Sequence, residues 1–295
     1  MIKDRVAREL IYLIKTALIF AGMLGITIVL SHVLGGALAA KELEMLENEQ
    51  VLATAMLELI GMQMLQQFPA NIEVFFLIIM VLNLIVMGTI IGHSVHAMRK
   101  SVEQGAFGFL YMQTMHTGMY FGITVLLVLM TALLTWGIYS AELFLASNFL
   151  LKGYGAAVFS SVYAILTSIA GLGAGVVVLM VSISVLYGVA QSYSMHGVDF
   201  GLAIMGLSFV LGNVYKIPQV IGHNQIEQMI NAQQTMEVAR MLKQIRFLCP
   251  FSWLNPFNIY NYILSPRMIG SYVIVAVAIF VIAGVVFCLR DWQEV

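Results

Sequence analysis

The chain has 295 residues, of which 61% are hydrophobic and only 10% are charged, and its mean hydropathy is +0.93. A soluble domain carries about 25% charged residues, so this composition excludes an ordinary soluble domain and indicates a membrane protein. The net charge of −1 says nothing about a nucleic-acid partner, and the sequence has no basic tail or basic, aromatic-rich patch that would support one.

Apolar runs recur along the chain, and most are close to or above the roughly 20 residues that a helix needs to cross a bilayer. They predict an all-α polytopic membrane protein with one transmembrane domain over residues 1–295. Six spans are expected, at residues 11–36, 72–92, 117–139, 156–191, 200–215 and 268–289. The fourth is longer than a plain span and contains GLGAG at 171–175, so it is either one tilted or kinked helix or a re-entrant pair.

Three polar segments are expected to be helical outside the bilayer core. The charged residues 1–10 predict a short surface helix, and the apolar run after them is too long for a signal-peptide core, so we expect it to be retained. Residues 41–68 are acidic with an apolar stripe at helical spacing, and residues 219–248 are polar and amphipathic. Both are predicted to be outer helices.

Two other segments are expected to connect spans. Residues 140–155 are predicted to be a short connection between the third and fourth spans. The sequence CPFSWLNPFNIYNYILSP, at 249–266, is rich in aromatic residues and interrupted by prolines. Such a composition is typical of the membrane–water interface.

Basic residues predict the orientation, because Lys and Arg are enriched on the cytoplasmic side of spans. Lys3, Arg5, Arg8 and Lys15 lie on the N-terminal side of the first span, whereas only Lys41 follows it closely. We therefore expect a bacterial plasma-membrane protein whose six spans place both termini, and the segment between the second and third spans, in the cytoplasm.

The sequence lacks the motifs of the common enzyme sites. It has no G-x-x-x-x-G-K-[ST] phosphate loop, no H-E-x-x-H zinc motif and no G-x-S-x-G nucleophile elbow. We expect no catalytic residue and no cofactor in this chain. The acidic residues Glu73, Glu142 and Asp199 fall at span ends, which argues against a secondary carrier, because carriers keep polar or acidic groups near the midplane.

A short charged interruption separates the second and third spans. Residues 98–112, MRKSVEQGAFGFLYM, are predicted to form a helix that is polar at its start and aromatic at its end. Arg99, Lys100 and Glu103 can face water or a partner, and Phe107 and Leu110 can share one face. An ordinary interfacial helix is the plain alternative.

The order of these residues resembles the cytoplasmic E-x-G-T-x-x-x-L-L segment of type-2 ABC transporter permeases. Glu103 and Gly105 match its E-x-G, and Leu110 matches its first leucine. Ala106 stands in place of the threonine, and Met112 lies near the second leucine position. The basic N-terminal surface helix, the large first outer loop, the six-span layout and the proline-aromatic run before the last span are also similar to this family.

The resemblance implies an ABCG-like exporter permease fold in which residues 98–112 form a coupling helix. The residues expected to contact the ATPase are Arg99, Lys100, Glu103, Gly105, Phe107 and Leu110. It further implies a dimer of permease subunits and a separate pair of cytosolic ABC ATPase subunits that bind ATP and Mg. The cargo would be hydrophobic or amphipathic: a peptide, a lipid-like molecule or a drug. A non-transporting membrane regulator or sensing subunit is the alternative, and a secondary carrier is a third.

Two other groups of residues have both a functional and a plain interpretation. His93, His96 and His116, with nearby methionines, could bind copper, but interfacial histidines explain them as well. The small-residue runs at 170–175 and 197–206 permit close helix approach, either within the chain or at a dimer seam.

Overall fold

A computed structural model describes residues 2–47, 68–103, 117–190, 203–204, 207, 253–261 and 266–289. All regular structure in these ranges is helical, as the composition predicts. The helices are α1 (Ile2–Glu47), α3 (Ala70–Glu103), α5 (Thr117–Leu151), α6 (Ala156–Ala190), α10 (Pro256–Asn261) and α11 (Pro266–Leu289).

Five helices in the described part of the chain are long and apolar enough to cross a membrane. Their apolar portions are Val6–Ala37, Ala70–Arg99, Phe121–Leu151, Ala156–Ala190 and Ile269–Leu289. They correspond to the first, second, third, fourth and sixth predicted spans. The predicted fifth span, 200–215, and the outer helix 219–248 lie outside the described residues, apart from three helical residues at 203, 204 and 207.

Several helices extend beyond the predicted boundaries. The surface segment 1–10 and the first outer helix were predicted as separate elements, but residues 2–47 form one helix without a break. They contain no proline, so nothing in the backbone forces an interruption. Residues 48–67 lie outside the described part of the chain.

The predicted connection at 140–155 is wrong over most of its length. Helix α5 continues to Leu151, and only residues 152–155 form the turn. Residues 140–151 contain neither glycine nor proline, and the turn comes where Gly153 takes a positive φ of 101°. The long apolar run that follows is a single 35-residue helix, α6, and not a re-entrant pair.

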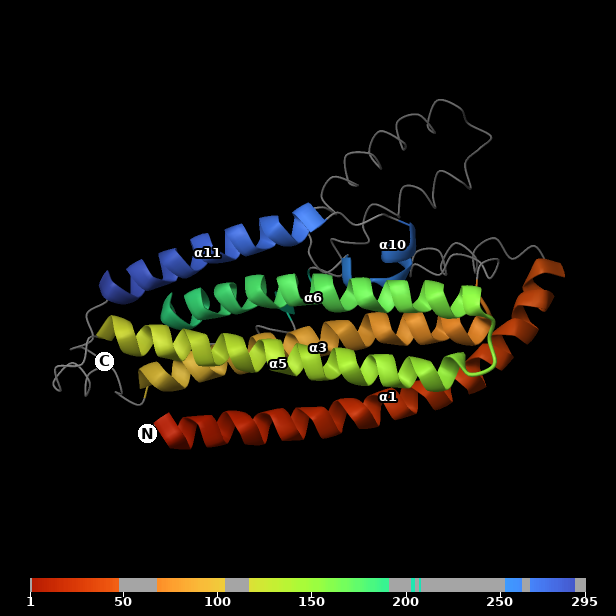
Figure 1. The fold of residues 1–295 in the computed structure, drawn as a ribbon, viewed down its shortest axis with the longest axis horizontal. Coiled ribbons are helices and arrows are strands. Elements are labelled where there is room, and N and C mark those ends of the chain that lie inside the picture. Colours follow the sequence, from red (N-terminus) through yellow and green to blue (C-terminus); the bar gives the residue numbers. More distant parts are fainter. Residues whose placement is uncertain are drawn as a thin grey trace, which may run out of the picture.

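The long helices lie side by side in a bundle, with α11 against α6 (Figure 1). The start of α1 and the ends of α3, α6 and α11 gather at one end, which we call the N-terminal end of the bundle. Helices α3 and α6 form the centre, since 67% of the residues in the most apolar window of each are buried, against 22% for α1 and α11. The apolar outer faces of α1 and α11 suit contact with lipid, as expected of a membrane bundle.

Glycines allow the helices to approach closely where they cross. A Cβ at Gly35 of α1 would lie 2.6 Å from the Cα of Asn71 on α3. At Gly173 of α6 it would overlap the indole of Trp136 on α5, and at Gly175 it would lie 3.3 Å from Cγ2 of Ile269 on α11. The small-residue run at 170–175 therefore serves packing within the chain.

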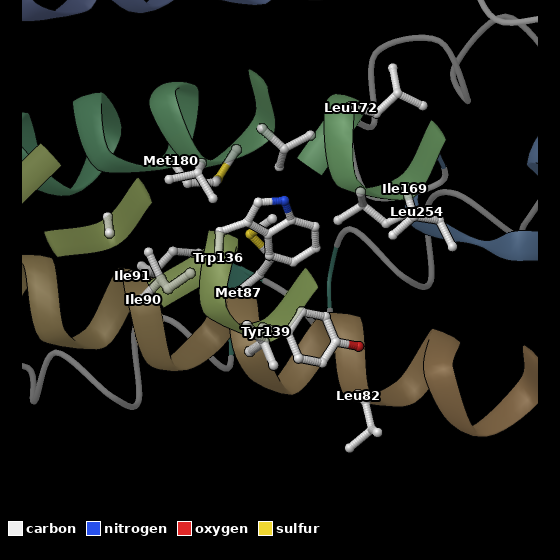
Figure 2. Packing of buried hydrophobic residues seen from close by; sticks show 14 of the residues in the cluster. Leu82, Met87, Ile90, Ile91, Trp136, Tyr139, Ile169, Leu172, Met180 and Leu254 are labelled. Atoms are coloured by element: carbon white, nitrogen blue, oxygen red, sulfur yellow. The ribbon is translucent and has the colours of Figure 1, made fainter. Parts of the chain in front are cut away.

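Apolar side chains from three helices and one connecting segment surround Trp136 (Figure 2). They include Met87 and Ile90 of α3, and Ile169 and Met180 of α6. The described residues of the proline-aromatic run also belong to this core, because Trp253, Leu254 and Phe257 are buried. This part of the run packs inside the protein, where its composition alone suggested the membrane interface.

Candidate functional site

The predicted ATPase-coupling residues fall partly within the described chain. Arg99, Lys100 and Glu103 lie in the last turns of α3, in direct continuation of the second span. Gly105, Phe107 and Leu110 lie outside the described residues, as does the rest of the predicted coupling helix after residue 103. We call residues 99–103 the α3 end segment.

The α3 end segment begins directly after a close contact between α3 and α6. Met98, the residue before it, is fully buried, and a Cβ at Gly188 of α6 would lie 2.8 Å from the Cβ of Met98. Val95, one turn earlier, is also buried. The residues just before the α3 end segment are therefore closely packed against α6.

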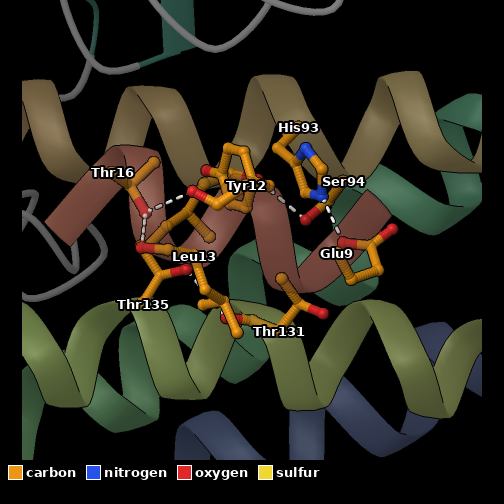
Figure 3. Close-up of polar contacts among 9 residues, drawn as sticks. Glu9, Tyr12, Leu13, Thr16, His93, Ser94, Thr131 and Thr135 are labelled. Carbon is orange, nitrogen blue, oxygen red and sulfur yellow. Dashed lines mark hydrogen bonds and ion pairs between the residues drawn. The ribbon is translucent and has the colours of Figure 1, made fainter. Parts of the chain in front are cut away.

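A second polar group lies near the same end of the bundle, between α1 and α3. The carboxylate Oε2 of Glu9 lies 2.7 Å from Nε2 of His93 (Figure 3). The ring of Tyr12 stacks on the His93 imidazole, with centroids 3.7 Å apart and planes within 9°. The side chains of Glu9 and His93 are only 12% and 20% exposed, so this is a largely buried contact between two spanning helices.

Hydroxyl groups line this contact, and several bond to the backbone of their own helix. The Thr16 hydroxyl donates to the carbonyl oxygens of Tyr12 and Leu13, each at 3.0 Å. Ser94 donates to the Ile90 carbonyl on α3, and Thr135 to the Thr131 carbonyl on α5 (Figure 3). Such bonds satisfy the hydroxyls without joining helices, so Glu9–His93, together with the Tyr12–His93 stacking, links α1 to α3 here.

Sequence reasoning missed this contact. It assigned Glu9 to a surface segment and interpreted His93 either as a metal ligand or as an interfacial histidine. The signal that could have located Glu9 is the unbroken helical sequence across residues 2–20, which carries the acidic residue into the bundle. Within the described ranges, no three His, Cys, Asp or Glu side chains gather as a metal site would require, and His116 lies outside them.

A third polar group lies in the centre of the bundle. Asn83 of α3 is fully buried; its Nδ2 donates to the Leu254 carbonyl at 2.7 Å, and its Oδ1 accepts from the Tyr139 hydroxyl at 2.8 Å. One amide therefore joins α3, α5 and the segment before α10. Phe76 of α3 meets Phe257 edge-on, at a centroid distance of 6.0 Å, and supports the same docking.

These arrangements favour mechanical and structural roles for the polar groups. The central amide fixes a connecting segment in the core, the Glu9–His93 contact ties α1 to α3, and α3 carries its charged end segment directly out of the bundle. No family model matches this chain, and no curated protein and no solved structure matches it either.

Proposed function

We propose that the chain is the membrane-spanning permease subunit of an ATP-driven ABC exporter. The proposal is supported by the resemblance of residues 98–112 to the coupling segment of type-2 ABC permeases, and by one structural observation. That observation is the continuity of α3, which runs without a break from Ala70 to Glu103.

A continuous helix is suited to transmit force. At 1.5 Å per residue, the 34 residues of α3 extend about 51 Å, whereas the hydrocarbon core of a bilayer is about 30 Å thick. A partner that moves the α3 end segment would therefore move the whole of helix α3. Because Met98 packs closely on Gly188, that movement would be transmitted to α6, the other central helix.

The charges of the α3 end segment suit a partner surface with groups of both signs. Arg99 and Lys100 would meet carboxylates, and Glu103 would meet a basic residue of the ATPase. The partners are cytosolic ABC ATPase subunits, which bind ATP and Mg, and a second permease subunit. The chain itself holds no cofactor and catalyses no reaction. The cargo is hydrophobic or amphipathic, in keeping with the apolar spans.

The proposal is tested by a substitution that interrupts helix α3 without removing a charged residue. Ser101→Pro removes a backbone donor inside the last helical turns and clashes with the carbonyl one turn earlier. It should preserve membrane insertion but abolish most of the cargo-stimulated ATP hydrolysis in membranes that contain the ATPase. Ser101→Ala is the matched control and should behave as the wild type.

Two results would count against the exporter. Co-purification of the tagged chain without any P-loop ATPase would favour a regulator or sensing subunit. Nucleotide binding by the chain purified free of other proteins would also contradict the proposal, because the sequence has no phosphate loop.

A further inference from the structure

The contact between Glu9 and His93 joins two helices at a position where a single proton changes its strength. Nε2 and Oε2 lie 2.7 Å apart in a largely buried setting, and the Tyr12 ring holds the imidazole in place by stacking. A charged imidazolium makes a charge-assisted bond to a carboxylate, which is roughly twice as strong as a bond between neutral groups. A neutral imidazole can still donate a hydrogen bond to the Glu9 carboxylate, but it lacks the Coulomb attraction between two opposite charges.

We propose that Glu9 and His93 form a protonation-sensitive latch that holds the first turns of α1 against the end of α3. With His93 protonated the latch is an ion pair and is tight. With His93 neutral the attraction falls, and the first turns of α1 separate more readily from α3. The latch therefore loosens as the pH rises.

Glu9 is the charged group that the described part of the chain places within hydrogen-bond distance of His93. Tyr12 lies against the ring from α1, and Arg8, on the same helix, is exposed. Thr131 and Thr135 are the facing polar groups of α5 and do not titrate (Figure 3).

Three further titratable or charged groups lie at this level of the bundle. On α3 itself, His96 is exposed, and Arg99 follows it by three residues. Helix α6 contributes Tyr187, which directly precedes Gly188 in the sequence. The experiment therefore has to distinguish the effect of His93 from that of His96.

The latch lies close to the α3 end segment. His93 precedes Arg99 by six residues, which is about 9 Å along the helix. Release of α1 would remove one of the contacts that fix the base of this segment. The inference depends on the Glu9–His93 geometry and not on the proposed transport function, so it can be tested without an ATPase.

The test is amide hydrogen exchange of the first turns of α1 in lipid nanodiscs at pH 6 and pH 8, corrected for the intrinsic pH dependence of exchange. We expect the corrected rate in the wild type to be about tenfold higher at pH 8. Glu9→Gln and His93→Gln should each abolish the difference between the two pH values. His32→Gln, at an exposed α1 position, and His96→Gln should preserve it.

Two more variants keep the inference testable if a glutamine variant is unstable. His93→Lys keeps a positive charge at both pH values and should protect α1 equally at both. Tyr12→Leu removes the stacking without changing the charge, so exchange should rise at both pH values while their ratio remains. Equal protection of the wild type at pH 6 and pH 8, or a pH dependence that survives in Glu9→Gln and His93→Gln, would overturn the latch.

Discussion

The indole of Trp136 covers Gly173, and its Nε1 donates a 2.9 Å hydrogen bond to the carbonyl of Ala170 one turn away. The edge of the ring formed by Nε1, Cε2 and Cζ2 thus lies against the small-residue run of α6 and is held there by a directional bond. This pair of contacts fixes how α5 crosses α6, since the ring can enter only where α6 has no side chain. It also explains why GLGAG lies inside an uninterrupted helix.

Filling the glycine should destabilise the bundle. We expect Gly173→Ala to lower the free energy of unfolding by about 1–3 kcal/mol, because the added methyl group would overlap the indole and force a shift in the core. Thermal unfolding in detergent measures this change. Gly171→Ala is the control, since nothing lies within 4 Å of a Cβ at Gly171. If the two variants unfold alike, the close packing of Trp136 on α6 is not a source of stability.

The Asn83–Tyr139 bond should show measurable coupling. Asn83→Leu leaves the Tyr139 hydroxyl and the Leu254 carbonyl without this amide, and Tyr139→Phe removes the donor to Asn83 Oδ1. A double-mutant cycle on unfolding in detergent should give a coupling energy of about 0.6–1.7 kcal/mol. The exposed Tyr163–Asn148 pair is the comparison, and its coupling should be close to zero. Equal coupling in both pairs would contradict a special role for the buried amide.

The predicted coupling segment can be tested by substitutions that leave the bundle intact. Gly105→Trp, or Glu103→Lys together with Phe107→Ala, should leave the chain inserted and dimeric but lower ATPase co-purification and cargo-stimulated hydrolysis at least tenfold. A large side chain at position 105 blocks the close approach of a partner. The double variant reverses the charge at position 103 and removes the apolar side chain at position 107. Lys152→Glu, in the turn between α5 and α6 at the opposite end of the bundle, is the control and should retain full activity. Full stimulated hydrolysis in the first two variants would make residues 98–110 an ordinary interfacial segment.

The orientation gives a labelling prediction that uses both ends of the bundle. With Cys249 and Cys288 replaced, a cysteine at position 152 should react with an impermeant thiol reagent added to intact cells, and a cysteine at position 103 should react only after lysis. Lys152 and Glu103 lie at opposite ends of the bundle (Figure 1). A cysteine at position 240 is expected to react from outside, from the six-span count. Reaction of position 103 in intact cells would reverse the predicted orientation.

The sequence by itself determined the class of the protein and the approximate position of its apolar helices. An apolar run near 20 residues long must satisfy its backbone hydrogen bonds internally when it crosses lipid, so length and composition suffice to predict a helix. The helix ends were harder to predict. Residues 140–151 are helical because no glycine or proline stops the helix before Gly153, whereas the change to a more polar composition near residue 140 suggested a connection.

The tertiary structure decided which residues meet. Glu9 and His93 are 84 positions apart, and Asn83 and Leu254 are 171 apart, so no local pattern relates them. Helical periodicity tells which residues share a face, but not which face of another helix lies opposite it. That choice depends on where small residues such as Gly173 and Gly188 let two helices approach, because close packing, and not exclusion from water, selects the contacts between helices in a membrane.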